Sequence, residues 1–381
     1  MHSNAFQKNA PGVIVPGLGG INGFLPDALP PKWEFPSQLW PELNEANKQV
    51  YLLEGIGRSL PDPGLLLRPI QDREAIQSSR IEGTYATARE LLLYEMEPRD
   101  PKPGEYKVND WKEVFNYRRA LDHGTTSELP LSLRLIRELH EILMTGVRGK
   151  DKTPGEFRRI QVAIGENHRF VPPPPIHLQE CLDKFEKSMN APSDYDPLVQ
   201  CFLVHYQFET IHPFSDGNGR VGRLLLAIML QRLCGLTKPW IYLSEFYEKN
   251  RTQYVEGLFN VSTRAAWEEW VEFCIKGITD QAKETVERCN KLVTLRENYR
   301  ARLAKVGGHV RLTRIVERLF YHPFVRVADL QQRLNVTYPT AKADVARLVR
   351  ARILKEMKGE TPKTFFAPEL FDVAYADINE E

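Results

Sequence analysis

The stretch that decides how this chain is read runs from position 212 to position 223, His-Pro-Phe-Ser-Asp-Gly-Asn-Gly-Arg-Val-Gly-Arg. An apolar run, Leu224 to Leu230, follows directly and predicts a buried helix. Gly217 and Gly219 let consecutive backbone amides point into one concavity, which side chains would crowd. A helix that begins near Asn218 directs its unpaired amides and the positive end of its dipole at the same place. The stretch therefore predicts an anion-binding turn at the start of a helix.

The charged side chains of the same stretch add the chemistry of a phosphate site. Arg220 and Arg223 lie three positions apart, so both are expected to reach one face of the helix, where guanidinium groups bind phosphate oxygens. Asp216 offers an oxygen ligand for Mg²⁺, which binds through one or two carboxylates plus substrate phosphates. His212 can accept a proton near neutral pH. Asp-Gly and Asn-Gly also occur in ordinary turns, but the full combination favours a phosphate site with its own base.

This stretch resembles the signature of the Fic family, His-x-Phe-x-Asp/Glu-Gly-Asn-Gly-Arg-x-x-Arg, and matches it at every specified position. The resemblance implies a helical core and transfer of AMP from ATP to a hydroxyl group of a target protein. It implies that His212 is the general base and Asp216 the Mg²⁺ ligand. It assigns ATP binding to the rest of the signature, namely Gly217, Asn218, Gly219, Arg220, Gly222 and Arg223. The sequence contains no Walker-type phosphate loop.

Composition places the chain among globular proteins of more than one domain. It has 381 residues, 42% of them hydrophobic, and a formal net charge of +1. Its five cysteines are widely spaced, which argues against a disulfide framework or a zinc site. Because no signal peptide is evident and the longest apolar run is too short to span a bilayer, we expect a cytoplasmic protein without a membrane partner.

Apolar periodicity predicts a mainly α-helical fold, with helices near 41–59, 70–81, 84–96, 132–145, 196–211 and 265–303. Ser132 and Asp196 are the expected N-caps of two of these helices, with Pro197 at the first helical position and Gly146 beyond a C-terminus. Residues 11–36 are rich in Pro and Gly and are expected to be irregular, although their apolar side chains suggest that they pack on another part of the chain.

The exception to the helical pattern is residues 155–171, which alternate and are rich in β-branched side chains. They predict a β-hairpin that turns at residues 165–167. A purely structural hairpin is one interpretation. The position of this segment also matches the flap of Fic proteins, which pairs with the backbone of a target peptide. We therefore expect a target protein to dock along 155–171.

A second motif, Ser78-Ser79-Arg80-Ile81-Glu82-Gly83, precedes the signature. As a bare string it indicates the end of a helix, with Gly83 beyond the last turn. It also matches the inhibitory pattern Ser/Thr-x-x-x-Glu-Gly/Asn of Fic proteins whose inhibitory helix lies before the core. By that resemblance, Glu82 pairs with Arg223 and keeps the γ-phosphate of ATP from its partner.

The nucleoside end of the expected ATP site is less sharply defined. Residues 254–263 resemble the segment that lines the nucleoside pocket in long members of the family. The resemblance makes Tyr254 a candidate for stacking on the base and Asn260 a candidate for bonding its edge. Ordinary core packing for Tyr254 and a helix-end role for Asn260 are the alternatives.

The C-terminal residues 310–366 predict a helix, a helix-turn-helix and two short strands, and resemble a winged helix-turn-helix. Residues 301–358 carry 13 Lys and Arg against 4 Asp and Glu, a local excess of +9. Such a module can bind DNA, dock another protein or brace a homodimer, and the charge excess alone does not choose among these.

These observations predict an N-terminal region with the inhibitory helix at 1–100, a Fic-type catalytic core at 101–300 and a winged helix at 305–370. The leading hypothesis is an Mg²⁺-dependent protein adenylyltransferase that uses ATP, modifies a Ser, Thr or Tyr hydroxyl of a target or of itself, and is autoinhibited by Glu82. One alternative is removal of AMP at the same site, with Glu82 aligning a water molecule. The other is a DNA-binding regulator whose core only senses a nucleotide.

Overall fold

The computed structural model describes residues 5–17, 20–59, 62–100, 102, 104–147, 153–307 and 309–378. The fold is mainly helical, as predicted, and its elements follow one another without a large sheet. The helices up to residue 305 are α1 (Trp40–Ser59), α2 (Gly64–Ile81), α3 (Ala88–Met96), α4 (Tyr106–Thr126), α5 (Leu133–Met144), α6 (Pro175–Asn190), α7 (Pro197–Ile211), α8 (Asn218–Leu233), α9 (Ser244–Lys249), α10 (Arg251–Arg264) and α11 (Trp267–Lys305).

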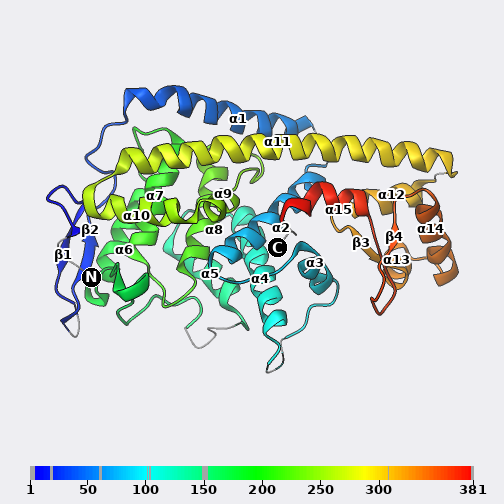
Figure 1. The fold of residues 1–381 in the computed structure, drawn as a ribbon, viewed down its shortest axis with the longest axis horizontal. Coiled ribbons are helices and arrows are strands. Elements are labelled where there is room, and N and C mark those ends of the chain that lie inside the picture. The colour runs from blue at the N-terminus through cyan, green and yellow to red at the C-terminus, as the bar shows by residue number, and fades with distance from the viewer. Residues whose placement is uncertain are drawn as a thin grey trace.

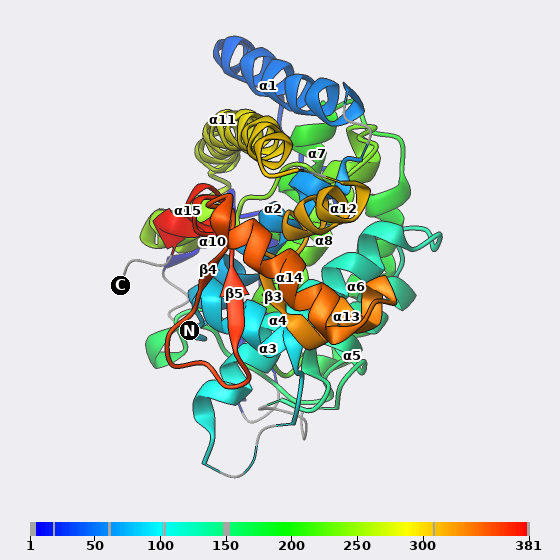
Figure 2. The same ribbon diagram turned by 90° about the vertical axis from the view of Figure 1, so that its right-hand side faces the viewer.

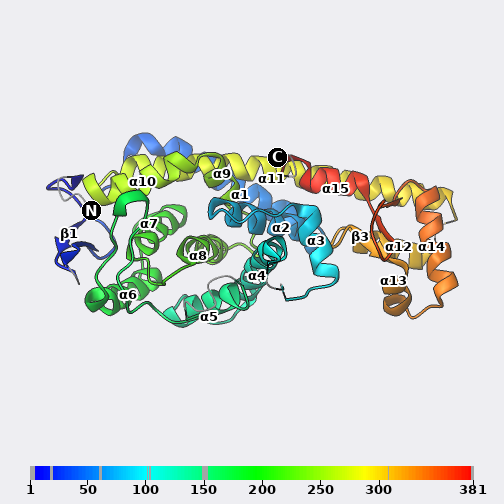
Figure 3. The same ribbon diagram turned by 60° about the horizontal axis from the view of Figure 1, so that its bottom comes forward.

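Helix α8 occupies the centre of the core. Figure 3 shows it between α7, α5 and α4, with α2 close by. Every residue from Val221 to Leu230 is buried, which explains the unbroken apolar run in the sequence. The predicted helix start at Asn218 is confirmed. The residues before it are therefore held on a rigid element.

Helix α11 spans most of the molecule. In Figure 1 it runs along one long side with α1 beside it, and it continues past the core to the C-terminal elements. Its 39 residues bury one stripe, including Trp270, Ile278 and Leu292, against the rest of the fold. The core and the C-terminal module thus share one helical support.

The predicted helix caps are confirmed. The hydroxyl of Ser132 accepts a hydrogen bond of 3.3 Å from the Leu135 amide. The carboxylate of Asp196 accepts one of 2.8 Å from the Leu198 amide, with Pro197 at the first helical position. Beyond α5, Gly146 has a φ of +67°, a left-handed conformation that glycine adopts without strain.

Two helix starts differ from the prediction. Helix α2 begins at Gly64 rather than near Ile70, because Leu65 and Leu66 are buried and Pro69 is accepted within the first turns. Helix α3 begins at Ala88 rather than at residue 84. Thr87 caps it, since the Thr87 hydroxyl accepts from the Glu90 amide and the Glu90 carboxylate accepts from the Thr87 amide.

The expectation of an irregular segment at 11–36 is wrong in part. Strands β1 (Gly12–Val15) and β2 (Gly23–Pro26) pair antiparallel, with Val13 opposite Leu25 and Ile14 opposite Phe24. The β-branched residues of β1 favour this pairing. The amide of Phe24 donates a 2.8 Å hydrogen bond to the carbonyl of Val171, so the segment packs on the core, as the apolar side chains suggested. A one-turn 3₁₀ helix, η3 (Ser37–Leu39), then leads into α1.

The hairpin predicted at 155–171 is also reduced. The described residues of this segment form one antiparallel bridge, Ile164 with Phe170, around a short 3₁₀ turn, η4 (Glu166–His168). The physical reason is that backbone amides earlier in the segment bond elsewhere: the Arg158 amide donates to the carbonyl of Pro213, and the Gly155 amide donates to the ring of His140. The segment is therefore fastened to the signature loop instead of to itself.

The C-terminal module has the element order that a winged helix-turn-helix predicts, with one strand more than expected. Figure 2 shows it facing the viewer, with α13 and α14 to the right of strand β5. The sheet is antiparallel in the order β3-β5-β4. The elements are α12 (Val310–Leu319), β3 (Phe324–Arg326), α13 (Val327–Leu334), α14 (Tyr338–Arg350), β4 (Lys355–Glu356), β5 (Thr364–Phe366), α15 (Pro368–Tyr375) and the 3₁₀ turn η5 (Ala376–Ile378).

Candidate active site

The signature loop joins α7 to α8 at the centre of the core. His212 ends α7 in a left-handed conformation, with a φ of +51°. A non-glycine residue holds that conformation only when its surroundings enforce it. The buried guanidinium of Arg158 does so here, since its Nε donates a 2.8 Å hydrogen bond to the His212 carbonyl and its Nη2 donates to the carbonyls of Ile211 and Pro173.

The rest of the loop is closed by Asn218. Its side-chain oxygen accepts a 2.7 Å hydrogen bond from the Phe214 amide, and its Nδ2 donates one of 2.9 Å to the Phe214 carbonyl. The Phe214 ring is fully buried and stacks on His140 with 3.8 Å between ring centres. His140 Nε2 in turn donates to the carbonyl of Asp216. The loop is thus pre-organised by its own asparagine and by α5.

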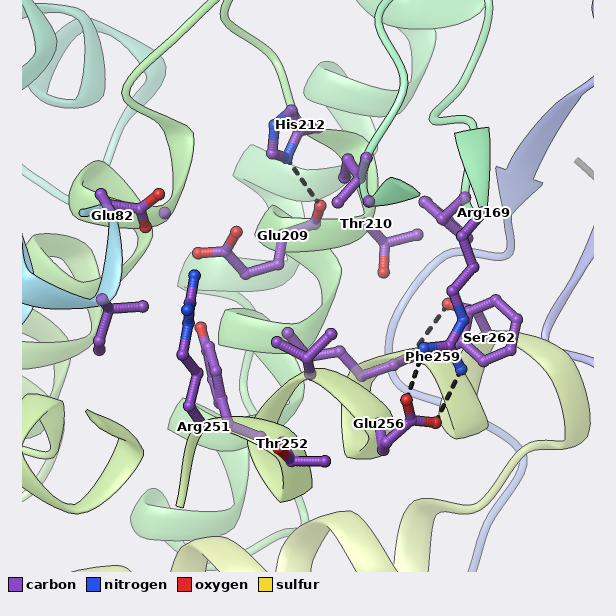
Figure 4. Close-up of a pocket in the computed structure, with 18 of the residues that line it drawn as sticks. Glu82, Arg169, Glu209, Thr210, His212, Arg251, Thr252, Glu256, Phe259 and Ser262 are labelled. Carbon is purple, nitrogen blue, oxygen red and sulfur yellow. Dashed lines mark hydrogen bonds and ion pairs between the residues drawn. The ribbon is translucent and has the colours of Figure 1, made fainter. Parts of the chain in front are cut away.

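A cavity of about 620 Å³ opens beside this loop. Figure 4 shows His212 and Glu82 toward one end, Arg169 and Phe259 toward the other, and Glu209 between them. Ion pairing closes the far end, where Arg169 Nη2 donates a 2.7 Å bond to Glu256 and the Arg169 guanidinium lies 4.1 Å from the centre of the Phe259 ring. The cavity therefore reaches from the signature loop to the flap and α10.

His212 is arranged as a neutral base. Its Nδ1 shares a 3.3 Å hydrogen bond with the Glu209 backbone carbonyl, and because a carbonyl only accepts, Nδ1 carries the proton. The lone pair of Nε2 then remains for another partner. Burial lowers the pKa of His212 to about 4, against the opposing effect of that hydrogen bond. At neutral pH the ring is therefore uncharged and able to take up a proton.

Arg223 lies in the same cavity wall and is fully engaged. Its Nε donates a 2.8 Å hydrogen bond to the Ser78 hydroxyl, and its Nη2 donates to the Ser78 carbonyl and to Glu82 Oε1, both at 2.8 Å. The arginine side chain is 2% exposed and the glutamate side chain 37% exposed. Ser78 and Glu82, the two ends of the Ser-x-x-x-Glu motif, thus both bind the guanidinium of Arg223.

The charges of this pair are mutually stabilised. Burial alone would raise the pKa of Glu82, but the charge and hydrogen bond of Arg223 outweigh burial and hold that pKa below its ordinary value. Burial likewise opposes the charge of Arg223, while Glu82 holds the arginine pKa above its ordinary value. The pair is therefore ionised at neutral pH.

Glu82 also covers the N-terminus of α8. A Cβ placed on Gly219 would lie 2.3 Å from Glu82 Oε1, so only glycine allows this approach without displacing the carboxylate. The first turn of α8 offers unpaired amides and a positive dipole end. The carboxylate occupies the place where the sequence predicts an anion.

Several predicted ATP-binding residues do other work in this structure. Arg220 does not share the cavity with Arg223: its Nη1 donates a 3.0 Å bond to buried Glu113 on α4. Gly222 faces α7, where a Cβ would meet Glu209 Oε1 at 2.1 Å. Asn218 closes the loop, as described. Asp216 is exposed at the rim, and its Oδ1 accepts a 2.7 Å bond from the Gly217 amide.

The two nucleoside candidates separate. Tyr254 lines the cavity but is 4% exposed, stacks on Tyr247 with 4.3 Å between ring centres, and bonds its hydroxyl to His205 Nε2 at 3.0 Å. Asn260 lies apart from this cavity and lines a groove between α1, α10 and α11. Leu258, Phe259 and Ser262 from the same part of α10 line the cavity and Asn260 does not, so a role for Asn260 in binding the base stays a prediction that this geometry does not support.

Three functional residues were not found from the sequence. Arg158 and His140 support the loop from distant segments, and no local pattern marks them. Glu209 lines the cavity, is 9% exposed, and its Oε1 has no hydrogen-bond partner among the described residues. Burial raises the pKa of Glu209 to about 8, against the pull of Arg223. A glutamate in the last turn of a helix that is buried along most of its length was the available signal.

Arg251, at the start of α10, was missed as well. It lines the cavity, and Figure 4 shows its side chain extending from α10 toward Glu209. Among the described residues, no ion pair engages it. It therefore presents a positive charge that an anion in the cavity could use.

Comparison with known protein families identifies the domains of this chain. Residues 130–230 match the Fic/DOC family, and residues 40–126 match the Fic/DOC family N-terminal domain. The chain carries a Fic domain. The Fic match ends within α8, and the N-terminal match includes Ser78 and Glu82.

Relatives of known name support the same assignment. A segment of 160 residues is 33% identical to the protein adenylyltransferase Fic of Drosophila erecta, covering 40% of this chain and 30% of that protein. A segment of 130 residues is 39% identical to its counterpart in Drosophila virilis, covering 33% of this chain and 26% of that protein. The matched part is thus at most 30% of the length of these relatives.

Solved structures share the fold. A Fic family protein from Desulfovibrio desulfuricans aligns with a TM-score of 0.58 at 19% identity, covering 89% of this chain and 98% of that chain. A fragment of Fic-1 from C. elegans aligns with a TM-score of 0.51 at 20% identity, covering 66% of this chain and 73% of that chain. Among the described residues, no helix combines the length and apolar character that a membrane span requires.

Proposed function

We propose that this chain is a protein adenylyltransferase that transfers AMP from ATP to a Ser, Thr or Tyr hydroxyl of a target protein and of itself. The observation that carries the proposal is that His212, whose Nδ1 is engaged by the Glu209 carbonyl and whose Nε2 is left for another partner, lines a cavity that Arg223 and Gly219 of α8 also line. The names of the Drosophila relatives support the same reaction. Figure 4 shows the residues that would surround the substrate.

In the proposed reaction, His212 Nε2 takes the proton of the target hydroxyl. The hydroxyl oxygen then forms a bond to the α-phosphorus of ATP, the bond from that phosphorus to the bridging oxygen breaks, and pyrophosphate leaves. Positioning and charge stabilisation account for most of the acceleration in reactions of this kind. In this chain those tasks fall to the amides at the start of α8, to Arg223 and to Arg251.

The residues present fit a magnesium ion. Asp216 is exposed at the rim of the loop, and its Oδ1 accepts from the Gly217 amide. Mg²⁺ usually binds through one or two carboxylates together with substrate phosphates, so one carboxylate beside the proposed phosphate site is sufficient. A bound Mg²⁺ would neutralise charge on the phosphates, and Asp216 is the residue that would hold it.

The Glu82–Arg223 pair is proposed to hold this enzyme in a low-activity state. Glu82 occupies the fork of Arg223 and lies over Gly219, where a phosphate group would otherwise bind. The Glu82 carboxylate and the phosphates of ATP are both negatively charged and repel each other at this site, so ATP would bind in an unproductive pose. Glu82 also shares the cavity with His212, which supports a second reaction, hydrolytic removal of AMP with Glu82 aligning the water.

The target is proposed to dock along the flap at 155–171. The backbone around the Ile164–Phe170 bridge borders the cavity at its outer end, next to Arg169. Extended backbone of this kind can pair with a peptide strand. An approach from this side would bring a target hydroxyl toward His212.

The C-terminal module is a candidate DNA-binding unit. Lys342 and Arg350 are exposed on α14, the second helix of the helix-turn-helix, whereas Arg347 is turned toward His309. Because phosphate contacts release counterions, binding to duplex DNA should weaken steeply with salt. Salt-insensitive or absent binding would favour protein docking or a homodimer instead.

The central experiment uses two isotopically labelled forms of ATP. The Glu82→Gly protein is incubated with α-labelled ATP and, separately, with γ-labelled ATP, each with Mg²⁺. AMP transfer leaves label on protein only from the α position. Label from the γ position alone would indicate a phosphoryl transferase, and no label from either would refute the proposal.

A further inference from the structure

The last described elements of the chain, α15 and η5, lie across the helix that carries the inhibitory motif. Figure 1 shows α15 beside α2 and α11. The hydroxyl of Tyr375 donates a 2.9 Å hydrogen bond to Asp72, and Arg73 donates bonds of 2.6 and 2.9 Å to the two oxygens of Asp377. Asp72, Arg73 and Tyr375 are each at most 5% exposed. The side of the contact formed by Asp72, Arg73 and Tyr375 is therefore buried, and its polar groups are paired.

The same contact reaches the inhibitory motif itself. Arg80 lies between Ser78 and Glu82 in the last turn of α2, and its Nη2 donates a 3.1 Å hydrogen bond to the carbonyl of Ile378. The Ile378 side chain is 1% exposed. The end of α2, which places Glu82 against Arg223, is thus packed under η5.

Asp377 is the centre of this contact. Arg73 reaches it from α2, and Arg288 reaches it from α11 with a 3.0 Å bond, while Arg288 also donates to the carbonyl of Val373. Burial opposes its charge, but the two guanidinium groups outweigh burial and hold the pKa of Asp377 well below its ordinary value. One ionised carboxylate therefore ties the inhibitory helix to the long helix of the scaffold.

This segment is continuous with the C-terminal sheet. Strand β5 ends at Phe366, the next residue, Ala367, donates its amide to the Pro323 carbonyl at 3.0 Å, and α15 begins at Pro368. The module also meets α3, the helix that follows α2, where His322 Nε2 bonds to the Leu92 carbonyl at 3.0 Å. A displacement of the module would therefore act directly on α15 and on α2.

We propose that residues 368–378 clamp the inhibitory helix, so that loosening the clamp frees Glu82 from Arg223 and raises activity. The inference rests on the proposed function and assigns its control to the C-terminal module. The clamp keeps the end of α2 in the one position in which Ser78 and Glu82 both hold Arg223. When the clamp opens, this helix end gains alternative positions, and the guanidinium becomes available to phosphate.

The test is Asp377→Ala in the full chain, measured by the rate of auto-modification from α-labelled ATP. Its side chain is 50% exposed, so its removal leaves no buried cavity. We expect the rate to rise about fivefold over the wild type, the lower range of typical allosteric couplings. Asp372→Ala is the matched control, because this acid lies on α15, directly before the turn that carries Asp377, is exposed, and has no ion pair among the described residues. Tyr375→Phe, which removes only the bond to Asp72, should raise the rate by a smaller factor.

Glu82→Gly separates failure of the clamp from failure of the proposed function. If Glu82→Gly is active and Asp377→Ala matches Asp372→Ala, the clamp is wrong and the transferase stands. If Glu82→Gly incorporates no label, the transferase is wrong, and amide hydrogen exchange of residues 76–82 then tests the clamp alone. Faster exchange in Asp377→Ala than in Asp372→Ala supports the clamp, and equal exchange refutes it. The double variant of Asp377 and Glu82 should be no faster than Glu82→Gly.

Discussion

Glu82 Oε1 and Arg223 Nη2 lie 2.8 Å apart although 141 positions separate the two residues in the chain. The carboxylate reaches the arginine from the C-cap position directly after α2, and the arginine projects from the buried helix α8. One contact thus joins the N-terminal region to the signature. Any displacement of the end of α2 therefore changes the contact of Glu82 with Arg223, the cation of the proposed phosphate site.

Replacing His212 by Ala should abolish AMP transfer while ATP binding remains within about twofold of the wild type. His212 contributes a proton acceptor and no phosphate contact, and general bases typically account for about 10²–10⁴-fold in rate. Label incorporation from α-labelled ATP measures the rate, and equilibrium dialysis measures binding. His177→Ala, a partly exposed histidine on α6, is the control. Wild-type rates in His212→Ala would remove this residue from the mechanism.

Asp216→Asn should lower activity at least about tenfold and flatten its dependence on Mg²⁺ concentration. The asparagine oxygen can still accept from the Gly217 amide, so the turn is kept and only the charge is lost. Titration of the rate with MgCl₂ in both proteins gives the comparison. Superimposable titration curves would reduce Asp216 to a turn residue.

Arg251→Ala should raise the KM for ATP about tenfold with a smaller change in kcat, because its guanidinium lines the cavity without an ion-pair partner among the described residues. Arg251→Lys keeps the charge and should recover part of the affinity. Arg264→Ala, at the other end of α10 and paired with Glu269, is the matched control. Equal KM values in all variants would show that Arg251 is a surface residue only.

The sequence predicted those parts of the site that are held by local contacts and missed those held by distant residues. The turn at Gly217, the start of α8 and the caps at Ser132 and Asp196 depend on neighbours in the chain, and each was predicted. The bond from Arg220 to Glu113 spans 107 positions, and no local pattern indicates it.

The hairpin at 155–171 was overpredicted for the same reason. Alternation describes how side chains face, but the amides of this segment bond to the signature loop and to His140 instead of across a ladder. A family resemblance does not specify the rotation of α10, so it could not show that Asn260 lines the groove beside α1 and α11. The pairing of Glu82 with Arg223 came from the resemblance, and in the structure the buried guanidinium of Arg223 holds the partly exposed carboxylate of Glu82.

Stability should depend on pH through Glu209. Burial raises its folded-state pKa to about 8, whereas an unfolded glutamate titrates near about 4.3. Between these values the folded protein binds the extra proton, so the free energy of unfolding falls as pH rises through this window. Glu209→Gln removes the effect. The variant should gain at least about 2 °C in Tm over the wild type at pH 8.5 and less at pH 5.

The control for that measurement is Glu272→Gln, on the exposed side of α11, which should leave the difference between the two pH values unchanged. Thermal scans of each variant and of the wild type at pH 8.5 and at pH 5 give the Tm differences to be compared. A Glu209→Gln profile parallel to that of the wild type would mean that the carboxyl is ionised in the folded protein and that water or another group satisfies it.

Glu82→Gly should raise auto-modification at least about tenfold, which corresponds to about 1.4 kcal/mol in the barrier. Removing the carboxylate frees Arg223 Nη2 and clears the space over Gly219, so the phosphates can take the place that Glu82 occupied. Arg223→Ala should not reproduce this gain, because it loses the phosphate contact together with the inhibitory pair. Incorporation of α-label is the readout for all variants.

The double variant decides whether Arg223 transmits the effect of Glu82. If both residues act through their shared contact, Glu82→Gly with Arg223→Ala should have the low rate of Arg223→Ala, a non-additive result. A double variant as active as Glu82→Gly would mean that the carboxylate inhibits by covering the α8 N-terminus alone. Glu82→Gln distinguishes the two contributions further, since it keeps the bulk over Gly219 but loses the charge that engages Arg223. An intermediate rate for Glu82→Gln is expected, because repulsion of phosphate would vanish while steric blockage remained.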